Sequence, residues 1–266
     1  MRLTARLLTG FALLAICLAS PAMADFKKGM TAYEAGDYAT ALKEWRPLAE
    51  QGNTDAQYGL GLIYDSGKGV PQDNAEASRW YRKAAELGMA SAQSNLGVLY
   101  ASGEGGQQDF KEAARWYRRA AEQEYAMAQF NLGVLYAKGQ GVKQNYAEAV
   151  HWYRKAAEQG ETDAQLNLGL LYAKGQGVPQ SYAKAVRYYR MAAEQGDADA
   201  QSSLGLLYAK GQGVTQDDVQ AHLWLSLAAA QGDKRAPKER DLLVKKMAPA
   251  QLTQAQKLAR EWKPKK

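Results

Sequence analysis

Residues 128–163 read AQFNLGVLYAKGQGVKQNYAEAVHWYRKAAEQGETD, and close variants of this stretch recur along the chain with a period of 36 residues. We call the equivalent positions of successive units a column. Three columns keep the spacing of 36 residues without exception across five units: an Ala-Gln pair, a glycine and a tyrosine. The Ala-Gln column consists of Ala56-Gln57, Ala92-Gln93, Ala128-Gln129, Ala164-Gln165 and Ala200-Gln201. Several columns in register at a period of this length are typical of a stacked repeat array.

Each unit is predicted to form two helices. In the first half of residues 128–163, the apolar residues are spaced i, i+4, i+7 and i+8: Ala128, Leu132, Leu135, Tyr136. In the second half the spacing is i, i+3, i+4, i+7 and i+8: Ala149, Trp152, Tyr153, Ala156, Ala157. Both spacings place the apolar side chains on one helical face. Because helices this short are marginal in isolation, packing between neighbours must stabilise them, and we predict an all-α fold.

Residues between the helical segments agree with this division. The position before each second helix always holds a residue that caps helix N-termini well: Asp73, Asp109, Asn145, Ser181, Asp217. A glycine such as Gly139 stands where the first helix should end in the left-handed conformation. One departure is Glu124-Tyr125, which replaces the glycine that ends the other units, so we expect a different turn there.

The pattern resembles the Sel-1-like repeat, a tetratricopeptide-type helix pair. The residues that carry the resemblance most clearly are Leu132-Gly133, Tyr136, Gly139 to Val142, Ala149, Trp152-Tyr153 and Ala156-Ala157-Glu158. The resemblance implies a right-handed α-solenoid of antiparallel helix pairs, with five full units over residues 56–235. We expect residues 25–55 to form an N-terminal helix pair with a shorter loop, and residues 236–266 to form C-terminal capping helices and a basic tail.

The first 24 residues have the features of a secretory signal peptide. Arg2 and Arg6 precede an apolar stretch at 7–19, and small residues before the junction predict cleavage between Ala24 and Asp25. The apolar stretch is too short for a stable membrane span, and no later segment is long and apolar enough. The only cysteine, Cys17, lies in this segment, so we expect a mature periplasmic, or secreted, protein without disulfides.

Composition argues against several classes of function. With two histidines and one cysteine, the chain cannot build a Cys-rich zinc site or a three-His centre, and we predict neither metal nor cofactor. Residues 25–236 carry 23 basic and 25 acidic side chains, whereas residues 237–266 carry 9 and 3. The excess of positive over negative charge is therefore confined to the C-terminal end. We expect Lys263, Lys265 and Lys266 there to be solvated and frayed. This distribution does not favour nucleic-acid binding.

One repeated pair of columns suggests a binding surface. Asparagines occupy the same position of successive first helices, and lysines follow seven residues later on the same helical face: Asn95, Asn131, Asn167 and Lys138, Lys174, Lys210. The family resemblance implies that first helices line a concave groove, where amides can bind a peptide backbone and lysines can bind carboxylates. Two structural alternatives remain: a lysine near a helix C-terminus complements the helix dipole, and asparagine can bridge adjacent repeats.

Catalytic motifs are weak by comparison. Ser181-Tyr182-Ala183-Lys184 matches the Ser-x-x-Lys of penicillin-recognising enzymes, but neither Ser-Asp-Asn nor Lys-Thr-Gly accompanies it. We therefore predict a monomeric, non-catalytic scaffold or adaptor that binds a protein or peptide on its solenoid surface. Two alternatives are a cell-wall or β-lactam-interacting protein and a secreted virulence protein that binds a host factor.

Overall fold

The computed structural model describes residues 21–265, which form helices and connecting loops without any strand. The predicted signal peptide falls outside the described residues except for residues 21–24, which belong to the first helix. In chain order the helices are α1 (Pro21–Glu34), α2 (Tyr38–Glu50), α3 (Thr54–Ser66), α4 (Asn74–Glu86), α5 (Ala90–Ser102), α6 (Phe110–Glu122), α7 (Ala126–Lys138), α8 (Tyr146–Glu158), α9 (Thr162–Lys174), α10 (Tyr182–Glu194), α11 (Ala198–Lys210), α12 (Asp218–Ala230), α13 (Ala236–Val244) and α14 (Pro249–Glu261).

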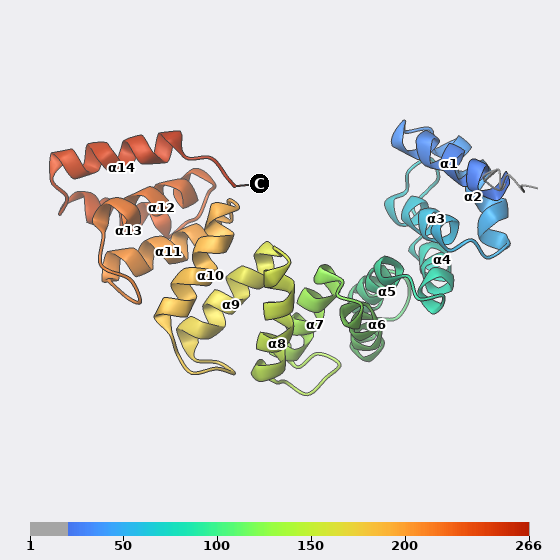
Figure 1. Ribbon diagram of the computed structural model, residues 1–266, viewed down its shortest axis with the longest axis horizontal. Coiled ribbons are helices and arrows are strands. Elements are labelled where there is room, and N and C mark those ends of the chain that lie inside the picture. The colour runs from blue at the N-terminus through green and yellow to red at the C-terminus, as the bar shows by residue number, and fades with distance from the viewer. Residues whose placement is uncertain (1–20, 266) are drawn as a thin grey trace, which may run out of the picture.

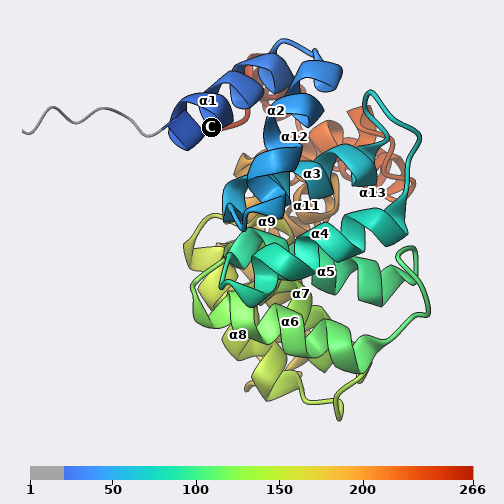
Figure 2. The same cartoon turned by 90° about the vertical axis from the view of Figure 1, so that its right-hand side faces the viewer.

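The helices form a solenoid in which each packs mainly against its neighbours in the chain. Figure 1 shows them arranged along an arc, with α1 and α14 on opposite sides of its open end. Figure 2 shows the array descending from α1 at the top to α8 near the bottom, with the loops after α3 and α5 on the same side. The predicted all-α solenoid of helix pairs is confirmed. Below, α3, α5, α7, α9 and α11 are called first helices, and α4, α6, α8, α10 and α12 second helices.

In four of the five units, a tyrosine ring of the second helix packs against a glycine of the first. A Cβ added to Gly133 would lie 2.7 Å from the ring of Tyr153, so only glycine permits the observed helix separation. The same contact recurs at Gly61, Gly97 and Gly169. In the last unit a leucine, Leu225, replaces the tyrosine. This close approach explains why the glycine column is kept in the middle of a helix, where glycine is otherwise unfavourable.

Two polar columns connect successive units. An arginine of α2 or of a second helix donates to the tyrosine hydroxyl of the next first helix, 18 residues later, as in the 3.1 Å bond from Arg154 to Tyr172. The other pairs are Arg46–Tyr64, Arg82–Tyr100, Arg118–Tyr136 and Arg190–Tyr208. These bonds hold each helix pair against the next.

The second column consists of buried glutamines, which satisfy both ends of their amides. Gln129 donates from Nε2 to the Ala121 carbonyl at 3.1 Å, and its Oε1 accepts from Gln159 at 2.8 Å. Gln93, Gln165 and Gln201 repeat this arrangement with Gln123, Gln195 and Gln231. Gln57 makes the first bond but not the second, because Leu87 occupies the position of the donor, and its buried Oε1 has no partner.

The turn at Glu124 keeps the geometry of the other units. Glu124 has φ 63°, in the left-handed region that Gly88 and Gly160 occupy at the equivalent positions. The expectation of a different turn is therefore wrong. The chain retains the turn because the stacking of α6 on α7 requires it, and the glutamate adopts a backbone conformation unfavourable for residues with a Cβ.

The basic C-terminal tail folds back on the array. Lys265 donates from its backbone N to the Glu194 carbonyl at 2.7 Å, and its Nζ lies 2.9 Å from Glu194 Oε2. Trp262 packs edge-on against Trp224, with ring centroids 6.2 Å apart. Lys265 is exposed, as expected, but it is not frayed, because a cation at the C-terminus of α10 meets both the helix dipole and a carboxylate. Lys266 lies outside the described residues.

Candidate functional site

The predicted asparagine and lysine columns lie on the solvent side of the first helices. Asn95, Asn131 and Asn167 are half-buried, and Lys138, Lys174 and Lys210 are exposed. Between the two columns runs an apolar column that the sequence analysis missed: Leu62, Val98, Val134, Leu170, Leu206. Val98 is 41% exposed and Leu170 is 38% exposed. We call these three columns together the first-helix stripe.

The asparagines already have contacts within the protein. Asn167 Nδ2 donates to the Asp163 carbonyl of its own helix at 2.7 Å. Burial strongly raises the pKa of Tyr81, and a hydrogen bond from the Asn95 side chain opposes that rise. Burial also raises the pKa of Tyr58, and the Asn95 side chain opposes that rise, so Asn95 lies beside two tyrosines of the preceding repeat. Asn167 therefore retains only part of its hydrogen-bonding capacity for a ligand.

The lysines stand in the last turn of α7, α9 and α11, directly before the glycine that ends each helix. This position complements the helix dipole. Within residues 21–265, none of the three forms an ion pair with a carboxylate. Their ammonium groups form a positive edge along the stripe, spaced one repeat apart.

A negative edge lies at the opposite ends of the same helices in the last two units. Asp163 and Asp199 are exposed in the first turns of α9 and α11. Burial raises the pKa of Asp197, and the neighbouring carboxylates of Asp199 and Asp163 raise it further. Burial and Asp163 likewise raise the pKa of Glu161. Unlike charges thus flank the apolar column in this part of the array.

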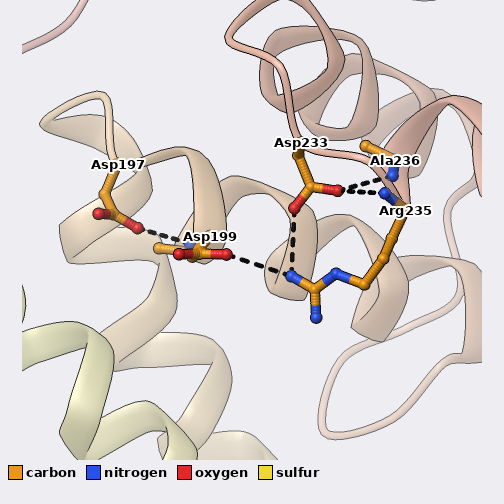
Figure 3. Close-up of polar contacts among 6 residues, drawn as sticks. Asp197, Asp199, Asp233, Arg235 and Ala236 are labelled. Carbon is orange, nitrogen blue, oxygen red and sulfur yellow. Dashed lines mark hydrogen bonds and ion pairs between the residues drawn. The ribbon is translucent and has the colours of Figure 1, made fainter.

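One arginine partly neutralises the negative edge where the array meets α13. Figure 3 shows the Arg235 guanidinium between Asp199 and Asp233, at Nη2 to oxygen distances of 3.2 and 3.1 Å. Asp233 also accepts from the backbone N–H groups of Arg235 and Ala236, and so caps α13. The carboxylate of Asp197 caps α11 through the Ala200 amide at 2.7 Å. Asp163 has no such cation beside it in the described part of the chain.

The residues of the Ser-x-x-Lys motif serve the start of α10. Ser181 Oγ accepts from the Lys184 backbone N–H at 3.3 Å, as an N-cap residue does. The Lys184 ammonium points elsewhere and lies 5.1 Å from the centre of the Tyr172 ring. The geometry is that of a helix cap with a nearby cation–π contact. Separately, no helix among residues 21–265 has the length and hydropathy to span a membrane.

Comparison with known proteins agrees with the repeat architecture. The Sel1 repeat profile matches residues 54–89, 90–125, 126–161, 162–197 and 198–233. No curated relative matches the chain. A Sel1 repeat protein from Oxalobacter formigenes is 41% identical with a TM-score of 0.75, and the match covers 80% of this chain and 88% of that one.

A second similar structure is c5321, a protective antigen present in uropathogenic Escherichia coli strains that displays an SLR fold. It is 37% identical with a TM-score of 0.82, over 90% of this chain and 53% of that one. The chain thus spans about half the length of the E. coli protein. Five contiguous profile matches and two structures of this kind lead to one conclusion: the chain belongs to the Sel1 repeat family.

Proposed function

We propose that the protein is a non-catalytic periplasmic scaffold that binds a peptide or protein partner along the first-helix stripe. Sel1 repeat proteins are generally scaffolds for protein interactions. The likeness to a protective antigen of uropathogenic E. coli is consistent with a protein that leaves the cytoplasm. Cleavage between Ala24 and Asp25 would release the mature chain.

The observation that carries this proposal is the exposure of two residues of the apolar column, whose other three residues are partly buried. Val98 and Leu170 expose about two fifths of their surface, at 41% and 38%, in positions that the repeat aligns. Isolated exposed apolar residues are ordinary, whereas exposed apolar residues that lie on one aligned apolar column beside charged columns are typical of an interaction surface. Burial of such side chains supplies affinity, and the flanking charges supply orientation.

The charges predict the kind of segment that fits. A partner lying across the stripe would place apolar side chains over Leu170 and Leu206. It would place acidic groups near Lys174 and Lys210, and basic groups near Asp163 and Asp199. The amides of the asparagine column would contribute only the hydrogen bonds left free by their internal contacts.

Photo-crosslinking in living cells tests the surface. A photoreactive residue replaces Leu170 in one variant and, as a control, exposed His151 on second helix α8 in another. We expect a specific adduct from position 170 and none from position 151. A partner that crosslinks from position 151 instead would refute this placement.

Substitution then separates binding from stability. Asn131→Ala combined with Lys174→Ala should weaken capture of the crosslinked partner about tenfold and leave thermal unfolding nearly unchanged. Loss of stability in proportion to loss of binding would assign these residues a structural role. Fractionation of the producing cells tests the periplasmic location, since a secreted protein would be found in the medium.

A further inference from the structure

The junction between the last repeat and the C-terminal helices lacks the arginine–tyrosine pair that joins the earlier units. Continuing the arginine column by one period from Arg190 gives Ser226 on α12, and continuing the tyrosine column from Tyr208 gives Val244 on α13. Two small side chains therefore replace two large ones at the same place in the fold.

Three further positions at this junction are polar where the repeats are small or apolar. Arg240 continues the column of fully buried leucines that ends at Leu204. Asp241 continues the glycine column. His222 stands where the preceding units have Ser78, Ala114, Val150 and Val186. Five departures from the repeat thus meet in one region, and they change both its volume and its chemistry.

These five residues line a solvent-open cavity of about 400 Å³ between α12, α13 and α14. Helix α14 completes its wall with Leu252, Gln256, Ala259 and Arg260. Sites for small molecules usually lie between about 300 and 1,000 Å³ and combine an apolar wall with a few polar groups. The cavity meets both conditions.

The polar groups of the cavity favour an anion. His222 is only 4% exposed, and its Nδ1 lies 3.3 Å from Ser226 Oγ. Arg240 uses Nε and Nη2 to bind Asp241, at 3.2 and 3.0 Å. Arg260 is exposed and forms no ion pair within the described residues. When the His222 imidazole is neutral, the two guanidinium groups and the single carboxylate leave one uncompensated positive charge in the cavity. Guanidinium groups bind carboxylates well.

Part of the cavity lining is apolar. Val244, Leu252 and Ala259 are partly buried and present hydrocarbon to the cavity beside Arg260. We propose that this cavity binds a small monocarboxylate with a short apolar body, whose carboxylate meets Arg260 and whose hydrocarbon part lies on Val244 and Leu252. The site is separate from the first-helix stripe, so it stands or falls independently of the proposed scaffold function.

Histidine NMR on the full chain provides a direct test. The chain has two histidines, and exposed His151 on α8 serves as an internal reference for buried His222. Hexanoate is the probe, with hexanamide and inorganic phosphate as comparison ligands. We expect hexanoate to give a saturable shift of the His222 imidazole resonances while those of His151 stay in place.

Two sets of variants identify the recognition groups. Arg260→Gln should weaken hexanoate binding about tenfold, as expected for loss of a charge-assisted bond, whereas Lys257→Gln on the same helix removes a charge outside the cavity and should change little. Ser226→Arg with Val244→Tyr restores the arginine–tyrosine pair and should abolish the shift. Thermal unfolding of each variant checks that the fold is intact.

The outcomes are distinct. A shift with hexanoate alone that depends on Arg260 supports the site. Equal shifts with hexanamide would overturn recognition of charge, and equal shifts with phosphate would overturn the role of the apolar wall. No saturable shift of His222 with hexanoate would overturn the site itself.

Discussion

Replacing Leu87 with glutamine should stabilise the protein, because it supplies the one donor missing from the buried glutamine column. The equivalent donors, such as Gln123, reach the preceding glutamine Oε1 at 2.8–2.9 Å, whereas Gln57 Oε1 is buried without a partner. A buried unsatisfied acceptor costs about 1–3 kcal/mol. Leu87 is 60% exposed, so the substitution removes little apolar burial. We expect Leu87→Gln to raise the free energy of unfolding by about 1 kcal/mol and the Tm by about 2–4 °C.

Urea denaturation followed by circular dichroism measures the change. Leu87→Ala removes the same side chain without adding an amide and should not stabilise. In a Gln57→Met background the acceptor is gone, so Leu87→Gln should lose its benefit, and the difference between the two backgrounds isolates the hydrogen bond. The reasoning fails if Leu87→Gln is no more stable than Leu87→Ala, or if its gain persists without Gln57.

Two further predictions concern backbone conformation and pH. Glu124→Gly should raise the free energy of unfolding by about 1 kcal/mol, because Glu124 has φ 63°; Glu124→Ala, which keeps the Cβ, should leave the Tm unchanged in the same thermal melts. Burial lowers the pKa of His222 below its ordinary value of 6.5; the charge of Arg240 lowers it further, and that of Asp241 opposes the change. The other charged group lining the cavity is Arg260. The unfolded chain therefore binds a proton at His222 more readily than the folded chain does. The free energy of unfolding consequently carries no cost from His222 above pH 6.5, and it decreases as the pH falls below that value. Thermal melts at pH 7.5 and pH 5 should show a larger loss for the native chain than for His222→Val, and equal losses would contradict this assignment.

Local signals in the sequence were sufficient to predict the helices. The capping residue Asp73 and the left-handed glycine Gly139 act within a few residues of themselves, so their effect can be inferred without the tertiary structure. The same local logic failed at Glu124, where stacking of α6 on α7 imposes the turn against the preference of the residue. It also missed the exposed apolar column, although aligning the five units would have revealed Val98 and Leu170 in register.

The sequence alone determined that this chain is an all-α repeat array, because a period of 36 residues and the apolar spacing inside it admit few other folds. Only the tertiary structure decided which columns meet: Gln129 with Gln159, Arg154 with Tyr172, and Lys265 with Glu194 across 71 residues. These contacts depend on the angle and offset at which successive helix pairs stack. The period in the sequence does not encode that geometry directly, so the closed C-terminal tail and the cavity beneath α14 emerge only when the helices are packed.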